Sequence, residues 1–383
     1  MYKNLRQFLA AADRLALGLC YVGMSVLYGT LFARFPEWLD AIEVQKAEFG
    51  LSLLSMSIGA LVFAPITSWL ILRFRVGPTL LVGMLLMSIS FITPVLAKSF
   101  EMLLLAMFLL GMTTTWINVA VNAAASTVEK RDKTSILAMC HGMFSIGGVI
   151  GAVSAGLIAS LGISILTHLS ILALLSILTI WWIRRPMLNL AHEGATQSRQ
   201  LQWPTLPVLK LSVIAFFIVM GEVAVMDWST IHLQHLKSSP FVMGLGFAGY
   251  SLSMAIGRLN GDALIPAIGP RKLVSVGILI GVLGMALAAL FPHIPAALAG
   301  FTLVGLGFSC VIPTLYGASA RVAKNNPAIG ITAIATAGIL GVLFGRPMLG
   351  YIAEYWGLQF GFALLAVFSI IAALFCRFTR FGY

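Results

Sequence analysis

Charged side chains are scarce in this sequence of 383 residues: Asp, Glu, Lys and Arg make up 10% of it, whereas hydrophobic residues make up 60%. Soluble domains carry about 25% charged and about 45–50% apolar residues. A soluble chain of this composition would leave a large apolar surface in water. The composition therefore excludes a soluble protein and predicts a polytopic membrane protein.

Cysteine is also rare, and the four cysteines lie far apart within apolar stretches, without the spacing of a metal site or a disulfide framework: Cys20, Cys140, Cys310 and Cys376. The sequence has no recognisable nucleophile–base pair, metal-ligand cluster or phosphate-binding loop, so we expect neither an enzyme nor a bound cofactor or metal. Lys and Arg number 24 against 13 Asp and Glu, but they are scattered. Because nucleic-acid-binding proteins gather basic residues in a patch or stripe, no nucleic-acid partner is expected.

Long apolar runs fill most of the chain. A membrane helix needs about 20 predominantly apolar residues, and the runs predict an all-α membrane protein with twelve spans. The longest polar stretch, 184–208, separates a six-helix half at 1–183 from a second half at 209–383, and we interpret it as a cytoplasmic linker. The predicted spans lie near 13–36, 50–72, 78–97, 102–127, 135–161, 163–183, 209–233, 242–265, 271–291, 295–320, 328–355 and 358–377.

The basic residues indicate the orientation of these spans. If the N-terminus is cytoplasmic, most of the 24 Lys and Arg residues fall on the cytoplasmic side, as the positive-inside rule requires. The positive net charge is thus a topology signal. We expect a multi-pass protein with both termini in the cytoplasm.

The chain also repeats itself at an offset of 194 residues. At this offset six glycines of the first half coincide with glycines of the second, more than chance predicts. Since six is an even number of spans, the halves share one orientation, which is the parallel repeat found in many transporters. The coinciding pairs are Gly50 with Gly244, Gly83 with Gly277, Gly111 with Gly305, Gly147 with Gly341, Gly151 with Gly345, and Gly156 with Gly350.

Six short motifs occur in a familiar order along the chain: Phe35-Pro36, Asn118-Val-Ala-Val-Asn122, His141 through Gly148, Glu222 through Trp228, Gly257-Arg258 through Gly261, and Gly345-Arg346-Pro347. With them the whole chain resembles the major facilitator superfamily, in particular its fucose-permease-like and YbjJ-type bacterial inner-membrane transporters. The resemblance implies two rocking halves, alternating access, a proton gradient as energy source and a location in the bacterial inner membrane. We expect a monomer in the lipid bilayer whose partners are protons and a small-molecule substrate.

Charge inside a membrane span is costly and usually functional, and Glu222, Asp227 and Arg346 are the most informative ionisable residues of the predicted spans. Glu222 lies near the middle of span seven and is the favoured proton-coupling carboxylate, with Asp227 as a second candidate. At about 100° per residue the two differ by about 140° around the helix, so they cannot share one face. Arg346 of span eleven lies at a depth similar to that of Asp227. It either binds an anionic group of the substrate or holds Asp227 or Glu222.

Several polar and aromatic residues are candidates for substrate binding. Asn118 and Asn122 are spaced i, i+4, so their amides share one helix face, and His141 lies at a similar depth. They could bind a hydroxyl-rich solute, although for Asn122 a hydrogen bond between helices is the better explanation. Trp116, Tyr21, Tyr28 and Tyr250 are possible cavity aromatics, and of these Tyr28 and Trp116 are taken as candidates for substrate binding.

The gating candidates are Arg258 and Asp262, also spaced i, i+4, and Arg73. The superfamily usually has an acidic residue in the loop after span two, but the stretch that ends in Arg73-Phe-Arg75 lacks it. A gating salt bridge built on that acid is therefore not expected here.

Together these observations predict a proton-coupled symporter for a small polar solute, sugar-like or carboxylate-bearing. Proton-driven efflux of a drug, metabolite or siderophore would use the same fold and the same acid. A membrane sensor or scaffold that transports nothing is the alternative of another class, and it would tolerate substitution of Glu222 and Arg346.

Overall fold

The computed structural model describes residue 8 and residues 10–134, 136–190, 203–323, 326–379 and 381–382, without the side chains of Ala138 and Asp262. This part is helical, has no β-strand, and includes twelve helices or helix pairs long and apolar enough to cross a membrane. The predicted all-α fold with twelve spans is confirmed.

The helices up to the polar stretch are α2 (Ala12–Ala33), α3 (Phe35–Ala41), α4 (Lys46–Phe74), α5 (Val76–Ser90), a 3-10 turn (Thr93–Leu96), α6 (Phe100–Asp132), α7 (Leu137–Ser160) and α8 (Ile165–Leu188). Those after it are α9 (Leu206–His235), α10 (Pro240–Ile268), α11 (Pro270–Leu290), α12 (Ile294–Phe308), α13 (Val311–Val322), α14 (Pro327–Tyr355) and α15 (Gly357–Arg377). The tenth predicted span consists of α12 and α13, which are separated by a short break at Ser309 and Cys310.

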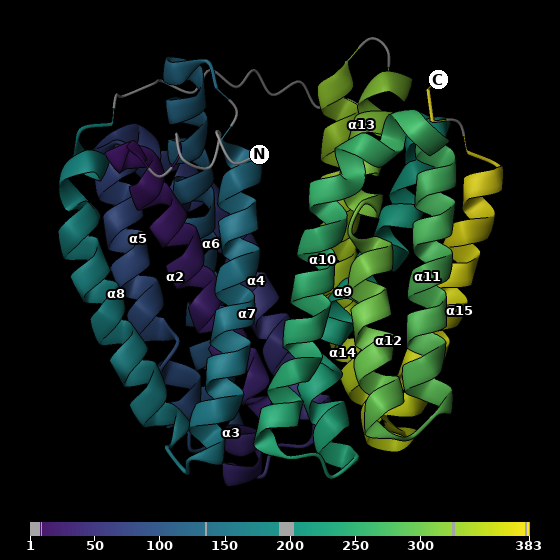
Figure 1. Cartoon of the computed structure of the whole chain (residues 1–383), viewed down its shortest axis with the longest axis horizontal. Helices are drawn as coiled ribbons and strands as arrows, with labels where there is room; N and C mark the ends of the chain where they lie inside the picture. Colours follow the sequence, from purple (N-terminus) through teal and green to yellow (C-terminus); the bar gives the residue numbers. More distant parts are fainter. Residues whose placement is uncertain are drawn as a thin grey trace. The chain divides into compact units, whose positions relative to one another are not determined.

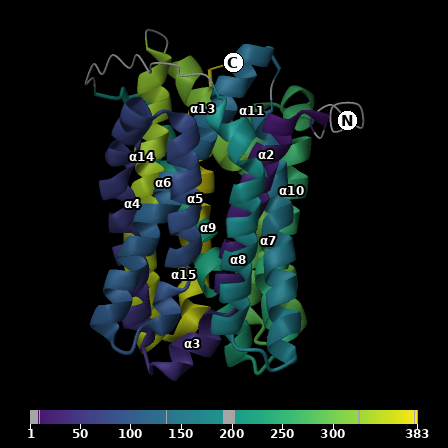
Figure 2. The same cartoon turned by 90° about the vertical axis from the view of Figure 1, so that its left-hand side faces the viewer.

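The helices form two compact units (Figure 1). The first comprises Met1–Val44 and Ser55–Gln197, and the second comprises Gln45–Leu54 and Ser198–Tyr383. In the first unit α2 packs along α7 and α8, and α5 packs against α6 and α8 (Figure 2). In the second unit α9 packs against α14 and α15, and α11 packs against α12 and α15. The beginning of α4 thus belongs to the second unit and the rest of α4 to the first.

Short polar side chains cap several of these helices. Ser99, Ser164 and Ser239 each accept a hydrogen bond from the backbone N–H three residues later, at the starts of α6, α8 and α10. Such caps satisfy donors that the helix itself cannot. The start of α7 is held by Glu129 of α6, whose Oε1 accepts hydrogen bonds from the backbone N–H groups of Ile136 at 2.6 Å and Leu137 at 2.9 Å.

The internal repeat is visible in how the glycines pack. Gly111 lies against the backbone of Met56 in the first unit, and Gly305 lies against the backbone of Tyr250 in the second. Both members of the second contact lie 194 residues beyond those of the first, so the two units contain the same helix crossing. The same holds for Gly147 on Val22 and Gly341 on Phe216, and for Gly151 on Val26 and Gly345 on Met220.

The start of the third span repeats as well. Arg75, before α5, has φ 70° and ψ 159°, and Gly269, before α11, has φ 78° and ψ 152°. Positive φ suits glycine and is costly for arginine. The Arg75 guanidinium donates a hydrogen bond to the carbonyl oxygen of Leu190 at 3.1 Å, and this bond offsets part of the cost of the positive φ. In the second unit the corresponding hydrogen bond is donated by Arg271, two residues after Gly269, to the carbonyl oxygen of Arg377.

Replacing Gly111 by alanine should destabilise the first unit. A Cβ there would overlap the Met56 carbonyl group, which is backbone and cannot rotate away. Overpacking of this kind costs about 1–3 kcal/mol. Gly142→Ala on α7 is the matched control, since a Cβ at Gly142 meets nothing within 4 Å. Thermal unfolding in detergent should show a lower melting temperature for Gly111→Ala alone, and equal melting temperatures would contradict the proposed close packing.

Candidate functional site

A buried ion pair joins α9 to α14 in the second unit. Arg346 Nε donates to Asp227 Oδ2 at 2.8 Å, and Arg346 Nη2 donates to Asp227 Oδ1 at 3.4 Å. Asp227 is 1% exposed and Arg346 is 8% exposed. The two residues lie 119 positions apart in the sequence. Of the roles that the sequence leaves open for Arg346, the structure thus shows the pair with Asp227.

Arg346 also reaches the beginning of α4. Its Nη1 donates to the backbone carbonyl oxygen of Leu53 at 3.3 Å. Removing one member of a buried ion pair leaves an uncompensated charge, so substitution of either residue is strongly destabilising. The guanidinium therefore ties α9, α14 and the segment Gln45–Leu54 together within the second unit.

Close backbone packing surrounds this clasp. Gly50 of α4 meets Gly350 of α14 so closely that a Cβ on Gly350 would lie 2.7 Å from the Gly50 Cα. One turn further, the Lys46 backbone N–H donates to Glu354 Oε2 at 2.8 Å. Trp228, which follows Asp227, packs edge-on to Phe49 at a centroid distance of 5.2 Å. We call Gln45–Leu54 and the residues of α9 and α14 that it contacts the clasp.

Glu222 has a different environment from Asp227. It lies on α9 and is half-buried, and its Oε1 is buried without a hydrogen-bond partner among the described residues. Arg258 of α10 is the basic residue that acts electrostatically on it. Tyr250, buried about two turns before Arg258 on α10, interacts electrostatically with Glu222, Arg258 and Asp227. The two acids of span seven are therefore used differently: one is fully paired, and the other keeps an unused oxygen.

A second polar cluster lies in the first unit, on α2, α6 and α7. The Tyr21 hydroxyl donates to Asn122 Oδ1 at 2.9 Å, and the Asn122 amide donates to the Asn118 carbonyl oxygen at 2.8 Å and to Asn118 Oδ1 at 3.1 Å. The His141 ring packs edge-on to Tyr21 at 5.4 Å. Asn118 and His141 are exposed, whereas Tyr21 is buried. Three predicted binding residues thus lie together on one polar surface.

The two remaining candidates for substrate binding are packed among other rings. Trp116 Nε1 donates to the Thr79 carbonyl oxygen at 2.9 Å, and its ring stacks on Phe63 at 5.2 Å. Tyr28 is half-buried beside Phe91, edge-on at 5.2 Å. The indole N–H of Trp116 is thus already used inside the helix bundle.

The gating candidates lie on α4 and α10, and each is described within its own unit. Arg258 is exposed on α10, and the side chain of its predicted partner Asp262 lies outside the described residues. Arg73 is exposed at the end of α4, where its guanidinium lies 5.5 Å from the centre of the adjacent Phe74 ring.

Sequence reasoning missed an ion-pair network between α2 and α6. Arg14 Nη2 lies 2.7 Å from Asp132 Oδ2, and Arg131 bridges Asp13 Oδ2 at 2.5 Å and Asp132 Oδ1 at 2.7 Å. The signal was present as two adjacent pairs of opposite charge near span ends, Asp13-Arg14 and Arg131-Asp132. Tyr21 was considered as a cavity aromatic, but its hydrogen bond to Asn122 was not foreseen.

Comparison with known proteins identifies the fold family. A family model for the Major Facilitator Superfamily matches residues 17–232 and 211–381. The chain belongs to the major facilitator superfamily. Within this superfamily, an uncharacterized MFS-type transporter of Yersinia pestis is 28% identical over 340 residues, which cover 88% of each chain. An uncharacterized transporter of Sinorhizobium fredii is 29% identical over 361 residues, covering 91% of this chain and 93% of the relative.

Solved structures of other major facilitator proteins share the fold of this one. A mutant of the nucleoside transporter NupG matches with a TM-score of 0.76 at 16% identity, covering 96% of this chain and 99% of that protein. A bacterial homolog of the human lysosomal transporter Spinster, inward-facing and occupied, matches with a TM-score of 0.76 at 15% identity and 95% coverage of both. The family match and the twelve candidate spans, rather than these distant structures, identify this major facilitator protein as a multi-pass membrane transporter. Its described residues contain no group of three or more His, Cys, Asp or Glu that could hold a metal ion.

Proposed function

We propose that this major facilitator protein is a proton-coupled symporter that moves a small polar solute across the bacterial inner membrane, with both termini in the cytoplasm. One observation carries the proposal: Glu222 places a carboxyl group inside a membrane helix, and its buried Oε1 has no hydrogen-bond partner in the part of the chain that the structure describes. Intramembrane acids are expensive and mark proton pathways. A carboxyl oxygen without a fixed partner is free to gain and lose a proton.

We assign solute recognition to the polar cluster of the first unit. Asn118, Asn122 and His141 together offer amide and imidazole donors and acceptors, the groups that bind hydroxyls of a sugar-like solute. Tyr21 holds Asn122 in place at 2.9 Å. Arg346 is assigned to the clasp rather than to the solute, because Asp227 and Leu53 already occupy its nitrogens.

We further propose that the clasp opens and closes during alternating access. Segment Gln45–Leu54 contains the beginning of α4, which starts at Lys46, and the remainder of α4 belongs to the other unit. A structure of two like halves changes access when one half moves relative to the other. Parting of this segment from α14 is the movement that such a change requires at this end of α4.

Substitution of Glu222 by glutamine tests the coupling. In proteoliposomes Glu222→Gln should abolish solute uptake driven by a pH gradient, while exchange of labelled for unlabelled solute continues, because glutamine keeps the shape but cannot take a proton. Glu101→Gln, at the exposed start of α6, should leave both unchanged. Gradient-driven uptake that survives in Glu222→Gln would remove the assignment.

The solute itself can be found by a thermal-shift screen against sugars and carboxylates. A solute that binds the polar cluster should stabilise the native protein, and Asn122→Ala should weaken its binding about tenfold, in line with the loss of one or two hydrogen bonds. Trp116→Phe, whose indole N–H is used internally, should keep the affinity. Equal affinity in Asn122→Ala would exclude the cluster as the binding surface. A solute pumped outward would indicate efflux instead of import.

A further inference from the structure

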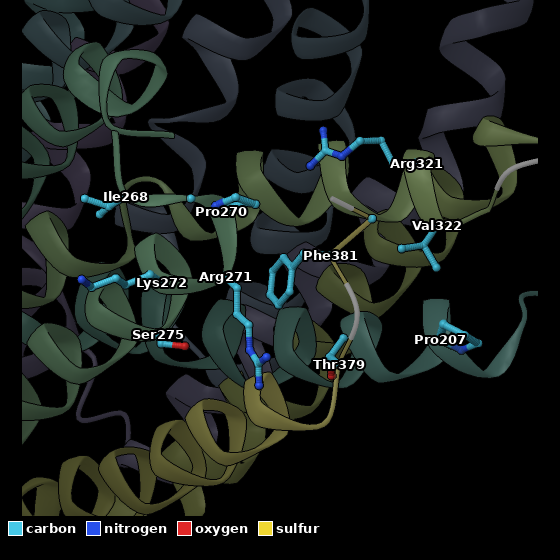
Figure 3. A pocket seen from close by; sticks show the side chains of 12 residues that line it. Pro207, Ile268, Pro270, Arg271, Lys272, Ser275, Arg321, Val322, Thr379 and Phe381 are labelled. Atoms are coloured by element: carbon cyan, nitrogen blue, oxygen red, sulfur yellow. The ribbon is translucent and has the colours of Figure 1, made fainter. Parts of the chain in front are cut away.

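A basic cavity of about 1130 Å³ lies within the second unit, at the start of α11 (Figure 3). It is formed by the beginnings of α9 and α11 and by the chain at the ends of α13 and α15. Arg271, Lys272 and Arg321 line it, and none of the described lining residues is acidic. Nothing in the proposed transport mechanism uses this cavity.

Figure 3 shows how the charges are arranged. In this view the Phe381 ring lies between the guanidinium groups of Arg271 and Arg321, and Lys272 lies on the same side as Ile268. Arg271 and Lys272 are exposed, so their charged groups are accessible. The hydroxyl-bearing residues Ser275 and Thr379 also line the cavity. The Thr379 hydroxyl already donates to the Phe375 carbonyl oxygen at 2.6 Å, so the cationic side chains are the donors that the walls offer to phosphate oxygens.

The helix that opens into this cavity adds to the positive potential. α11 begins with Pro270 after Gly269 and has no side-chain cap, so the backbone N–H groups of its first turn are not satisfied by a side chain. The N-terminal end of a helix carries a partial positive charge that favours anions. Two of the three basic side chains, Arg271 and Lys272, lie in this same turn.

Apolar side chains adjoin the basic ones. Leu206 is 66% exposed next to the lining residue Pro207, Phe378 is 73% exposed next to Thr379, and Ile268 lines the cavity itself while 38% exposed. A small soluble phosphate has no apolar part that could pack on these exposed side chains. A phospholipid places an anionic headgroup beside acyl chains and matches both kinds of surface.

We propose that this cavity binds the phosphate group of an anionic phospholipid. The headgroup contacts Lys272, Arg321 and the first turn of α11, and the acyl chains lie along Leu206, Ile268 and Phe378. Basic pockets among membrane helices on the cytoplasmic side are suited to anionic headgroups. Neither Glu222 nor a residue of the clasp lines this cavity. The proposed lipid site can therefore be tested independently of the proposed proton coupling.

Lipid titrations of the full chain in neutral detergent test the proposal. Short-chain phosphatidylglycerol should raise the melting temperature, and the double variant Lys272→Gln, Arg321→Gln should need about 25-fold more of it, since each basic residue near an anionic surface is worth about fivefold. Arg271 is left intact because it holds the end of α15. If the double variant does not fold, the single variant Lys272→Gln, at an exposed position, should show a fivefold loss of lipid affinity.

The controls separate this site from general charge and from soluble phosphate. Arg73→Gln with Arg185→Gln removes two exposed charges from the first unit and should leave the lipid affinity unchanged. Short-chain phosphatidylcholine and inorganic phosphate should stabilise the protein far less than phosphatidylglycerol. Equal losses in both double variants would overturn the proposed site, and stabilisation by inorganic phosphate at the same concentrations would overturn the assignment to a lipid.

Discussion

Replacing Arg346 by alanine is expected to cost the second unit about 3–5 kcal/mol of stability, the usual effect of leaving one member of a buried ion pair alone. Asp227, 1% exposed, would lose its counterion, and the Leu53 carbonyl group would lose a donor. Transport should be lost as well, because the beginning of α4 would no longer be tied to α14. Thermal unfolding in detergent and solute exchange in proteoliposomes measure the two effects.

Two further variants show whether the loss comes from the unpaired charge. Removing both partners, with Arg346→Met and Asp227→Leu, should recover much of the stability, because no charge then remains buried. It should not recover transport, since the bond to Leu53 stays broken. Arg185→Ala, an exposed arginine on α8, should lie within about 0.5 kcal/mol of the wild type. Arg346→Ala as stable as Arg185→Ala would contradict the buried pair.

Locking the clasp should stop transport. Lys46→Cys combined with Glu354→Cys places two thiols on adjoining turns of α4 and α14, where the Lys46 backbone N–H donates to Glu354 Oε2 at 2.8 Å and Lys46 Nζ donates to the Ala353 carbonyl oxygen at 3.5 Å. A short thiol crosslinker should join them and abolish exchange, and a cleavable crosslinker should allow exchange to return on reduction. The four native cysteines are buried and should react slowly.

The single variants Lys46→Cys and Glu354→Cys control for chemical modification. Each should keep its exchange activity after the same treatment, since one modified thiol cannot hold α4 to α14. Full exchange activity in the crosslinked double variant would mean that Gln45–Leu54 stays on α14 throughout the cycle. The proposed opening of the clasp would then be wrong, although proton coupling at Glu222 would be untouched.

The fold could be predicted because the sequence features that encode it can be recognised without knowing which residues contact each other. Span length depends on the thickness of the bilayer, and the repeat appears as glycine spacing. The pair Gly111–Met56 and its counterpart Gly305–Tyr250 show why glycines keep that spacing: each crossing brings one helix onto the backbone of another. The break between α12 and α13 was not predicted, since the apolar run continues through Ser309 and Cys310.

The partners of polar side chains could be predicted only in part. Similar depth in the membrane suggested that Arg346 and Asp227 could meet, but Glu222 and an anionic substrate remained equal alternatives until the rotation of α14 about its axis was known. The bond from Tyr21 to Asn122 joins helices that are 101 residues apart, and no local pattern encodes it. Arg14 and Arg131 were interpreted only as topology signals, because the positive-inside rule explains a basic residue at the end of a span as well as an ion pair does.

Proton movement that accompanies the solute is the most direct test of the central claim. Once the solute is known, it is added outside lightly buffered proteoliposomes without any imposed gradient, and the external pH is recorded. The wild type should take up protons with the solute, raising the external pH over the same time course as uptake, whereas Glu222→Gln should take up solute with no change in pH. Solute uptake by the wild type without proton movement, or proton movement that persists in Glu222→Gln, would contradict the account.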